Sequence, residues 1–172
     1  MAAVIVPDQH HADVRDELRR HVAPGQHRWH FRDERNAARH RFIAKMAELA
    51  ALDIESVTIT CSAPTQRKVE QARVRAVWGQ LAALKESQVR TLVIESRQDH
   101  NDRKDRREIM GAQRAGVASR SLTYCHARPK DEPLLWLPDA LAGAIGMSIA
   151  DNDHQLITML PEPLRQISRV GH

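Results

Sequence analysis

The spacing of apolar residues along the chain changes between a period of two and a period of three to four, which predicts strands that alternate with helices. Apolar and β-branched runs predict strands at residues 3–6, 28–31, 56–61, 89–94 and 121–125. Helical spacing predicts helices at about residues 8–22, 33–52, 102–115 and 133–147, and one that begins at Pro64 and continues to Leu84. This alternation predicts an α/β fold with about five strands in one mixed sheet and helices on both faces.

Two of the predicted strands differ in their expected burial. Residues 56–61 alternate apolar side chains with threonines, which predicts one buried and one exposed face. Residues 89–94 end in three successive apolar residues, which is typical of a strand covered on both faces. We therefore expect residues 89–94 to form a strand in the middle of the sheet.

Length and composition predict one domain, residues 1–172, with its own core. Hydrophobic residues make up 42% of the chain and charged residues 28%, close to the averages of globular proteins. The longest apolar stretches, residues 134–137 and 140–144, are interrupted by a proline and an aspartate and are too short to span a bilayer. The opening residues MAAVIV lack the basic region of a signal peptide. We expect a cytoplasmic protein without membrane contact, in which Cys61 and Cys125 stay reduced.

The basic charge balance permits an anionic partner. The formal net charge is +4 and the pI is about 9.5, with basic residues interspersed among acids. Within one charged helix, Arg103, Lys104, Arg106 and Arg107 could hold the backbone of RNA or DNA, although a solvated helix face accounts for the same residues. Because only 3% of the residues are aromatic, platforms for base stacking are scarce. Any contact with nucleic acid should therefore be mostly to phosphates.

The sequence lacks the motifs of several large classes of protein. It has no glycine-rich phosphate loop, no G-x-S-x-G, no H-E-x-x-H and no C-x-x-C, so nucleotide kinases, α/β hydrolases, zincins and zinc ribbons have no support. The ten histidines show no zinc-ligand spacing, and the adjacent His10 and His11 would point in different directions on a helix. We expect them to be surface residues.

Three acidic residues stand where a metal site could form: Glu95, Asp105 and Asp139. Glu95 ends a predicted strand, and open α/β sheets bind ligands at the carboxyl ends of their strands. Asp139 is a lone charge in an apolar segment, which is unfavourable unless it is paired, capping or bound to a cation. Converging carboxylates favour Mg²⁺ or Mn²⁺, and a pair of such ions can promote phosphodiester cleavage.

Each of these acids also has a simpler explanation. Glu95 could be a solvated charge at a strand end. Pro138 could break the last helix and let Asp139 cap the remainder. Asp105 and Asp102 could complement the dipole of their helix, although their i, i+3 spacing also places them on one face where they could help to hold a metal.

Four stretches of the chain resemble a family of mostly uncharacterised bacterial proteins with a ribonuclease-H-like fold: His30-Phe31 with Glu34, Val93-Ile94-Glu95, Asp105-Arg106-Arg107, and residues 131–140 (DEPLLWLPDA). The resemblance covers most of the chain, and the last stretch is its most specific part. It implies that Glu95 and Asp139 match the later acids of a metal site in this family, with Asp105 as a weaker candidate.

The sequence departs from this family at its start. Family members typically open with an Asp-Glu-Ser strand whose aspartate joins the later acids, whereas here Met1 leads into what resembles the second strand. Either the natural start lies upstream, the chain is trimmed, or the site is lost. A two-ion site without this carboxylate would bind metal poorly. A sheet short of one strand would also leave an edge that a second copy of the chain could cover.

Two hypotheses for function follow. The first is a nuclease or phosphoryl-transfer enzyme that depends on Mg²⁺ or Mn²⁺, acts on nucleic acid with Glu95 and Asp139 as metal ligands, and is inactive if the first-strand aspartate is missing. The second is a non-catalytic module on the same fold that binds nucleic acid or protein. A small-molecule enzyme has no motif in its favour.

Overall fold

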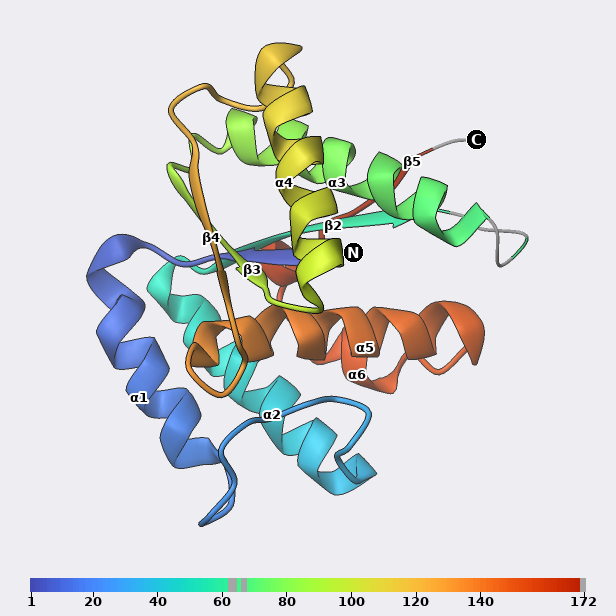
Figure 1. Ribbon diagram of the computed structural model, residues 1–172. Coiled ribbons are helices and arrows are strands. Elements are labelled where there is room, and N and C mark those ends of the chain that lie inside the picture. Colours follow the sequence, from blue (N-terminus) through green and yellow to red (C-terminus); the bar gives the residue numbers. More distant parts are fainter. Residues whose placement is uncertain (62–64, 66–67, 171–172) are drawn as a thin grey trace. The chain divides into compact units, whose positions relative to one another are not determined.

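The computed structural model describes residues 1–61, 65 and 68–170. Within these residues the chain forms six α-helices and five strands and divides into two compact units (Figure 1). Unit 1 consists of Met1, Val57–Arg128 and Ile167–His172, and unit 2 of Ala2–Ser56 and Pro129–Gln166. The strands lie in two sheets, one of three strands and one of two. The predicted α/β class is therefore confirmed.

The expected single sheet of about five strands is not formed. Residues 28–31 form no strand, and their alternation arises because Trp29 and Phe31 are buried in the core of unit 2 while Arg28 is exposed. Strand β5, Ile167–Val170, is not predicted by the sequence because residues 167–169 are all exposed and show no buried alternation. The sheets have three and two strands and not about five, so the ribonuclease-H-like topology stays a proposal.

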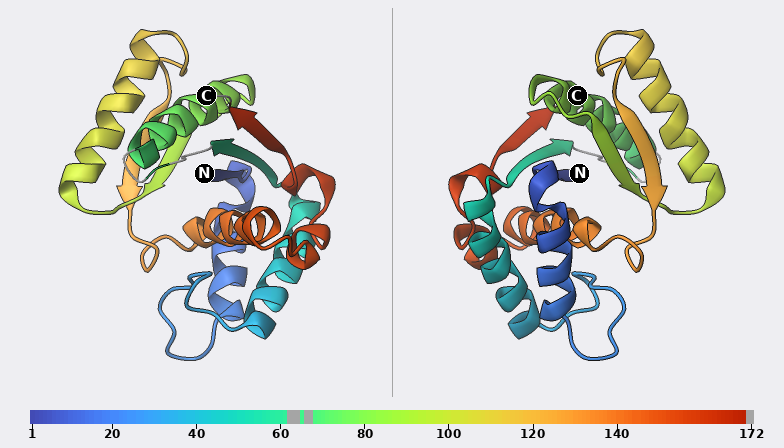
Figure 2. Two further views of the ribbon diagram at one scale, coloured as in Figure 1. Left: turned by 90° about the vertical axis from the view of Figure 1, so that its right-hand side faces the viewer. Right: turned by 90° about the vertical axis from the view of Figure 1, so that its left-hand side faces the viewer.

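Unit 1 is built around a parallel β-α-β arrangement. Strands β3, Thr91–Glu95, and β4, Thr123–Ala127, pair in parallel, and α4, Asp99–Arg114, lies in the connection that such a pair requires. Helix α3, Val69–Glu86, packs beside α4, and Figure 2 shows α4 running alongside the two strands. Their shared core contains Val77, Leu81, Ile109, Ala112, Ala118 and Leu122, and Leu92 and Tyr124 of the strands pack against it. The predicted start of a helix at Pro64 lies outside the described residues.

Strand β3 is less buried than its apolar run predicts. Its three central residues are only half-buried and its two end residues are exposed, because β3 has one neighbouring strand and one face against helices. Strand β2, Glu55–Cys61, is more buried and pairs in parallel with β5. The Gln80 side chain of α3 donates to the Val57 carbonyl at 2.7 Å and ties this helix to β2. The three successive apolar residues of β3 therefore do not indicate a position in the centre of a large sheet.

Helices supply the core of unit 2. They are α1, His11–His21; α2, Asn36–Leu49; α5, Trp136–Ala150; and the short α6, Gln155–Thr158. The loop before α2 contributes Trp29, whose ring stacks on Phe42 with 3.9 Å between centroids. Phe31 meets the edge of Trp29 and carries the Arg39 guanidinium 4.5 Å above its own ring. The loop is therefore held by aromatic packing and not by strand pairing.

Helix α5 continues through Pro138. This proline lies in the first turn, where the backbone needs no donor, and a 3-10 turn, η4, Pro133–Leu135, precedes the helix. The predicted helix at residues 133–147 is thus confirmed. By length and composition alone, Pro133–Ala150 could cross a membrane. Its apolar face is nevertheless buried in the core of unit 2, through Leu137, Ala140, Leu141 and Ala144.

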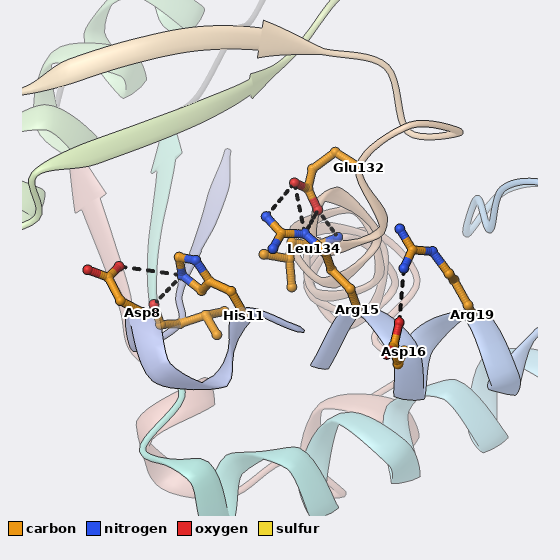
Figure 3. A network of polar contacts seen from close by, with 8 residues as sticks. Asp8, His11, Arg15, Asp16, Arg19, Glu132 and Leu134 are labelled. Carbon is orange, nitrogen blue, oxygen red and sulfur yellow. Dashed lines mark hydrogen bonds and ion pairs between the residues drawn. The ribbon is translucent and has the colours of Figure 1, made fainter. Parts of the chain in front are cut away.

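An ion pair joins α1 to the start of η4 (Figure 3). The Arg15 guanidinium donates to both carboxylate oxygens of Glu132 at 2.7–3.1 Å, and Glu132 also accepts from the backbone N–H of Leu134 at 3.0 Å. Burial acts to raise the pKa of Glu132, but these hydrogen bonds outweigh it and hold the pKa below its usual value. The pair therefore stabilises this junction at neutral pH and is lost as the pH falls through the lowered pKa.

Two glycines of α5 offer a matched test of the packing in unit 2. A Cβ atom at Gly143 would overlap the Phe31 ring, whereas one at Gly146 would meet nothing within 4 Å. Gly143→Ala should lower the free energy of unfolding by about 1–3 kcal/mol through overpacking. Gly146→Ala should raise it by up to about 1 kcal/mol through helix propensity. Urea unfolding measures both, and equal effects would contradict this position of Phe31.

Candidate functional site

Polar side chains gather at the carboxyl ends of β3 and β4 in unit 1. Glu95 is the exposed last residue of β3 and pairs in register with Ala127, so that His126 precedes this end on β4. The next residue, Ser96, donates its backbone N–H to the Ala127 carbonyl at 2.7 Å, and α4 begins at Asp99. Because open α/β sheets bind ligands at the carboxyl ends of their strands, this end of unit 1 is the candidate site.

Asp102 fixes the loop between β3 and α4. Asp102 is only 6% exposed. Its carboxylate accepts hydrogen bonds from the Arg97 backbone N–H at 2.9 Å and from the Ser96 hydroxyl at 2.7 Å. The bond from the Arg97 backbone is the largest influence on the pKa of Asp102 and lowers it. Burial acts to raise this pKa, and the Ser96 hydroxyl and the charge of His126 lower it further. The net lowering keeps Asp102 ionised at neutral pH.

Asp105 lies one turn later on the same face of α4 and is shared by two arginines. Arg73 of α3 donates to its two oxygens at 3.0 and 3.2 Å, and Arg97 donates to them at 3.1 and 3.2 Å. These guanidinium groups compensate a carboxylate whose residue is only 5% exposed. A pocket of about 150 Å³ beside them has acidic and basic walls, so it selects neither sign of ligand charge. Asp105 thus joins α3, α4 and the loop after β3.

His126 completes a group of three candidate metal ligands. One ligand atom each from Asp102, Asp105 and His126 lies within 4.8 Å of the others. In the described part of the chain, Nε2 of His126 is buried without a hydrogen-bond partner. Two carboxylates and an imidazole are donors that Mn²⁺ accepts. Arg73 and Arg97 place two positive charges against Asp105, and these charges oppose the approach of a divalent cation to this carboxylate. Binding of Mg²⁺ or Mn²⁺ stays a prediction.

The sequence predicts only part of this group. Asp102 and Asp105 share a helix face, as their spacing indicates, but the partners of Asp105 are far away in the sequence. His126 is missed because its place depends on the register between β3 and β4. Glu95 lies in unit 1 and Asp139 in unit 2, so their joint coordination of a metal stays a prediction.

Asp139 anchors a loop within unit 2. One of its oxygens accepts from the backbone N–H of Phe31 at 2.8 Å and lies 2.9 Å from Nδ1 of His30. The suggested break at Pro138 does not occur, because α5 begins two residues before this proline, and Asp139 therefore does not cap a helix. This lone charge in an apolar segment is explained by the loop that it holds.

The exposed face of α4 carries a stripe of arginines. Arg103, Arg107 and Arg114 follow helical spacing along one face, with Arg106 beside them, and all four are exposed. We call these four residues the α4 arginine stripe. Among the residues that the structure describes, none of the four has an ion-pair partner. The buried face of the same helix holds Asp102, Asp105, Ile109 and Ala112.

The stripe differs in two residues from the prediction for nucleic-acid contact. Lys104 lies to one side of it and has its ammonium 3.7 Å from a carboxylate oxygen of Glu70. Arg114 belongs to the stripe, and continuing the helical period from Arg107 by seven residues would have identified it. The predicted contacts of Arg103, Lys104, Arg106 and Arg107 with nucleic acid stay predictions.

The lowered pKa of Asp102 predicts how its contribution to stability depends on pH. Because the pKa in the folded state lies below the unfolded value, the contribution is present at neutral pH and is lost as the pH falls through the folded pKa. Asp102→Asn should lower the free energy of unfolding at neutral pH by about 1–3 kcal/mol. The difference from wild type should shrink below about pH 4.

Asp99→Asn is the control for this prediction, since Asp99 is an exposed residue in the same first turn. It should change the free energy of unfolding by only about 0.5 kcal/mol, through the helix dipole. Urea unfolding of both variants across this pH range provides the measurement. Equal losses in the two variants, or a loss at Asp102 that persists in acid, would contradict the role given to this carboxylate.

Comparison with known proteins leaves the function to be inferred from these side chains. The chain matches no protein-family model, and no curated protein or solved structure matches it.

Proposed function

We propose that this chain binds nucleic acid and that the α4 arginine stripe contacts the phosphate backbone. The stripe itself carries the proposal, since it presents four exposed guanidinium groups that have no ion-pair partner in the described part of the chain. The planar fork of a guanidinium group matches phosphate oxygens, and each phosphate that it neutralises releases condensed counterions. Such a face binds a polyanion without a preformed cavity.

The distribution of charge between the two units supports this proposal. Unit 1 contains fifteen lysines and arginines and seven aspartates and glutamates, a formal net charge of +8. Unit 2 contains eleven lysines and arginines and fifteen aspartates and glutamates, a formal net charge of −4. The modest basic excess of the whole chain therefore conceals a strongly basic unit that also carries the stripe. Such a charge attracts and steers an anionic partner.

An anionic membrane is a poorer match for the same surface. Helices that lie in a bilayer surface present a broad apolar face beside their basic residues. Along α4, the large apolar side chain that is exposed is that of Met110, at 43%. The apolar face of the helix is turned into unit 1 against α3 and the strands. The stripe can therefore hold phosphates at its surface but offers little to insert between lipids.

Metal-dependent cleavage of nucleic acid is the second candidate function, and the group of Asp102, Asp105 and His126 favours it. A bound Mg²⁺ or Mn²⁺ would supply a Lewis acid and an activated water for phosphodiester cleavage. The charge balance opposes it, because Arg73 and Arg97 already neutralise Asp105. We therefore place binding ahead of cleavage.

Replacing three arginines of the stripe tests the proposed binding. The triple variant Arg103→Gln, Arg107→Gln and Arg114→Gln keeps good helix formers at these positions. Fluorescence anisotropy with labelled DNA and RNA, duplex and single-stranded, gives the affinity over a range of salt concentrations. The slope of log affinity against log salt should become less steep by about 3, because each phosphate contact contributes about 0.9.

A matched triple variant in unit 2 removes the same charge from elsewhere. It replaces Arg32, Arg35 and Arg41 with glutamine, and all three are exposed. It should leave the salt slope unchanged. The proposal fails if the wild type binds none of the nucleic acids, if it binds anionic vesicles instead, or if the two triple variants lower the slope equally.

The two candidate functions predict different responses to Mn²⁺. For binding without cleavage, labelled RNA and DNA should stay intact during incubation with the wild type and millimolar Mn²⁺. Cleavage product that forms with the wild type but not with Asp105→Asn or His126→Ala would instead establish cleavage at the group of Asp102, Asp105 and His126. Product that depends on Glu95 and Asp139, tested as Glu95→Gln and Asp139→Asn, would place the reaction at the residues indicated by the family resemblance.

A further inference from the structure

We infer that the nucleic acid bound by the α4 arginine stripe is double-stranded and is held without regard to its base sequence. This inference rests on the proposed function and adds the class of ligand. Three features of the described part of unit 1 support it: no aromatic ring there is exposed, the stripe is long and strongly basic, and no hydrogen bond there would orient the arginines of the stripe.

Proteins that bind single strands usually stack successive bases on exposed aromatic rings. The structure describes all six phenylalanine, tryptophan and tyrosine residues of this chain, and none of them is exposed. Those of unit 1 are Trp78 and Tyr124, which pack against the core formed by α3, α4 and the two strands. The Trp78 ring also donates its N–H to Glu108 at 2.8 Å. A single strand would therefore meet arginines but no fully exposed aromatic ring on which its bases could stack.

A duplex offers the stripe a denser and more rigid array of phosphates. Arg103 and Arg114 are separated by eleven residues, which corresponds to about 16 Å along an α-helix. A duplex carries one negative charge per about 1.7 Å of its axis, whereas each strand carries one per about 3.4 Å. A flexible single strand must also be ordered before several of its phosphates can face one helix. With no stacking to compensate, the duplex should bind more tightly.

The stripe is not built to read bases. An arginine that recognises guanine must present its fork to the base edge in a fixed orientation. In the described structure no side chain forms a hydrogen bond that would hold Arg103, Arg106, Arg107 or Arg114 in one orientation. Such arginines can follow phosphates of any sequence. The backbone that they recognise is common to duplex DNA and duplex RNA, and both belong in the test.

The test measures the affinity of the full chain for a duplex of about two helical turns and for each of its component strands at one fixed salt concentration. Fluorescence anisotropy is used with DNA and RNA versions of one sequence and with a shuffled sequence of the same composition. We expect at least one duplex to bind about tenfold more tightly than its strands. Shuffling should change the Kd less than about threefold. Tryptophan emission should change little on binding, because no indole stacks on a base.

The stripe variant provides the second measurement, since Arg103→Gln, Arg107→Gln and Arg114→Gln should reduce affinity for the duplex more than affinity for the strands. Equal or tighter binding of single strands, or strong tryptophan quenching with them, would overturn the duplex preference while leaving the proposed function in place. A large loss of affinity on shuffling would overturn the sequence independence. Absence of binding to every nucleic acid would instead defeat the proposed function itself.

Discussion

Burial of two carboxylates on one face of α4 is the constraint on which the arrangement of unit 1 depends. An ionised carboxylate is stable away from water only when other groups pair with it. Asp102 is paired with the loop after β3, and Asp105 with Arg97 of that loop and Arg73 of α3. These bonds fix the rotation of α4 about its own axis. Once the acidic face is turned inward, the helical period turns the arginine stripe outward.

The same separation of charge supports our proposal that unit 1 binds an anion. Its buried Asp105 is already neutralised by two arginines, whereas the arginines of the stripe face solvent without an ion-pair partner among the described residues. Unit 2 is held differently, by the stacking of Trp29 on Phe42 and by the pair of Arg15 and Glu132, and its net charge is negative. We therefore propose that unit 1 is the part of the chain that binds a polyanion.

Helical periodicity predicted most of the fold, because the amphipathic faces of α1, α2, α4 and α5 repeat over several turns. The alternation of apolar and polar residues was a less reliable predictor of strands when it extended over only four residues. It predicted a strand at residues 28–31, where the buried Trp29 and Phe31 of a loop produce the same alternation as a strand. It gave no prediction of β5, because residues 167–169 are all exposed. The larger sheet has three strands where about five were predicted, because the division of the strands between two sheets depends on pairings that local patterns do not encode.

For the candidate site, the sequence indicated the acidic and basic positions of α4 but not their roles. Asp105 attracted attention as a metal ligand, and only the fold shows that Arg73, which lies 32 residues earlier, is bonded to it. The sequence did not identify His126 as part of this group, because its neighbours depend on the register between β3 and β4. Asp139 was correctly singled out as a charge that needs a partner, and that partner is a loop backbone more than a hundred residues away.

We propose that one face of α4 organises unit 1 while the other meets phosphate. An NMR titration of isotopically labelled protein with a short nucleic-acid duplex at low salt examines both faces at once. We expect chemical-shift changes concentrated at residues 103–114 and reversed by added salt, with the hydrogen bonds from Arg97 to Asp102 and Asp105 preserved. Changes centred in unit 2 while α4 stays unperturbed would contradict it.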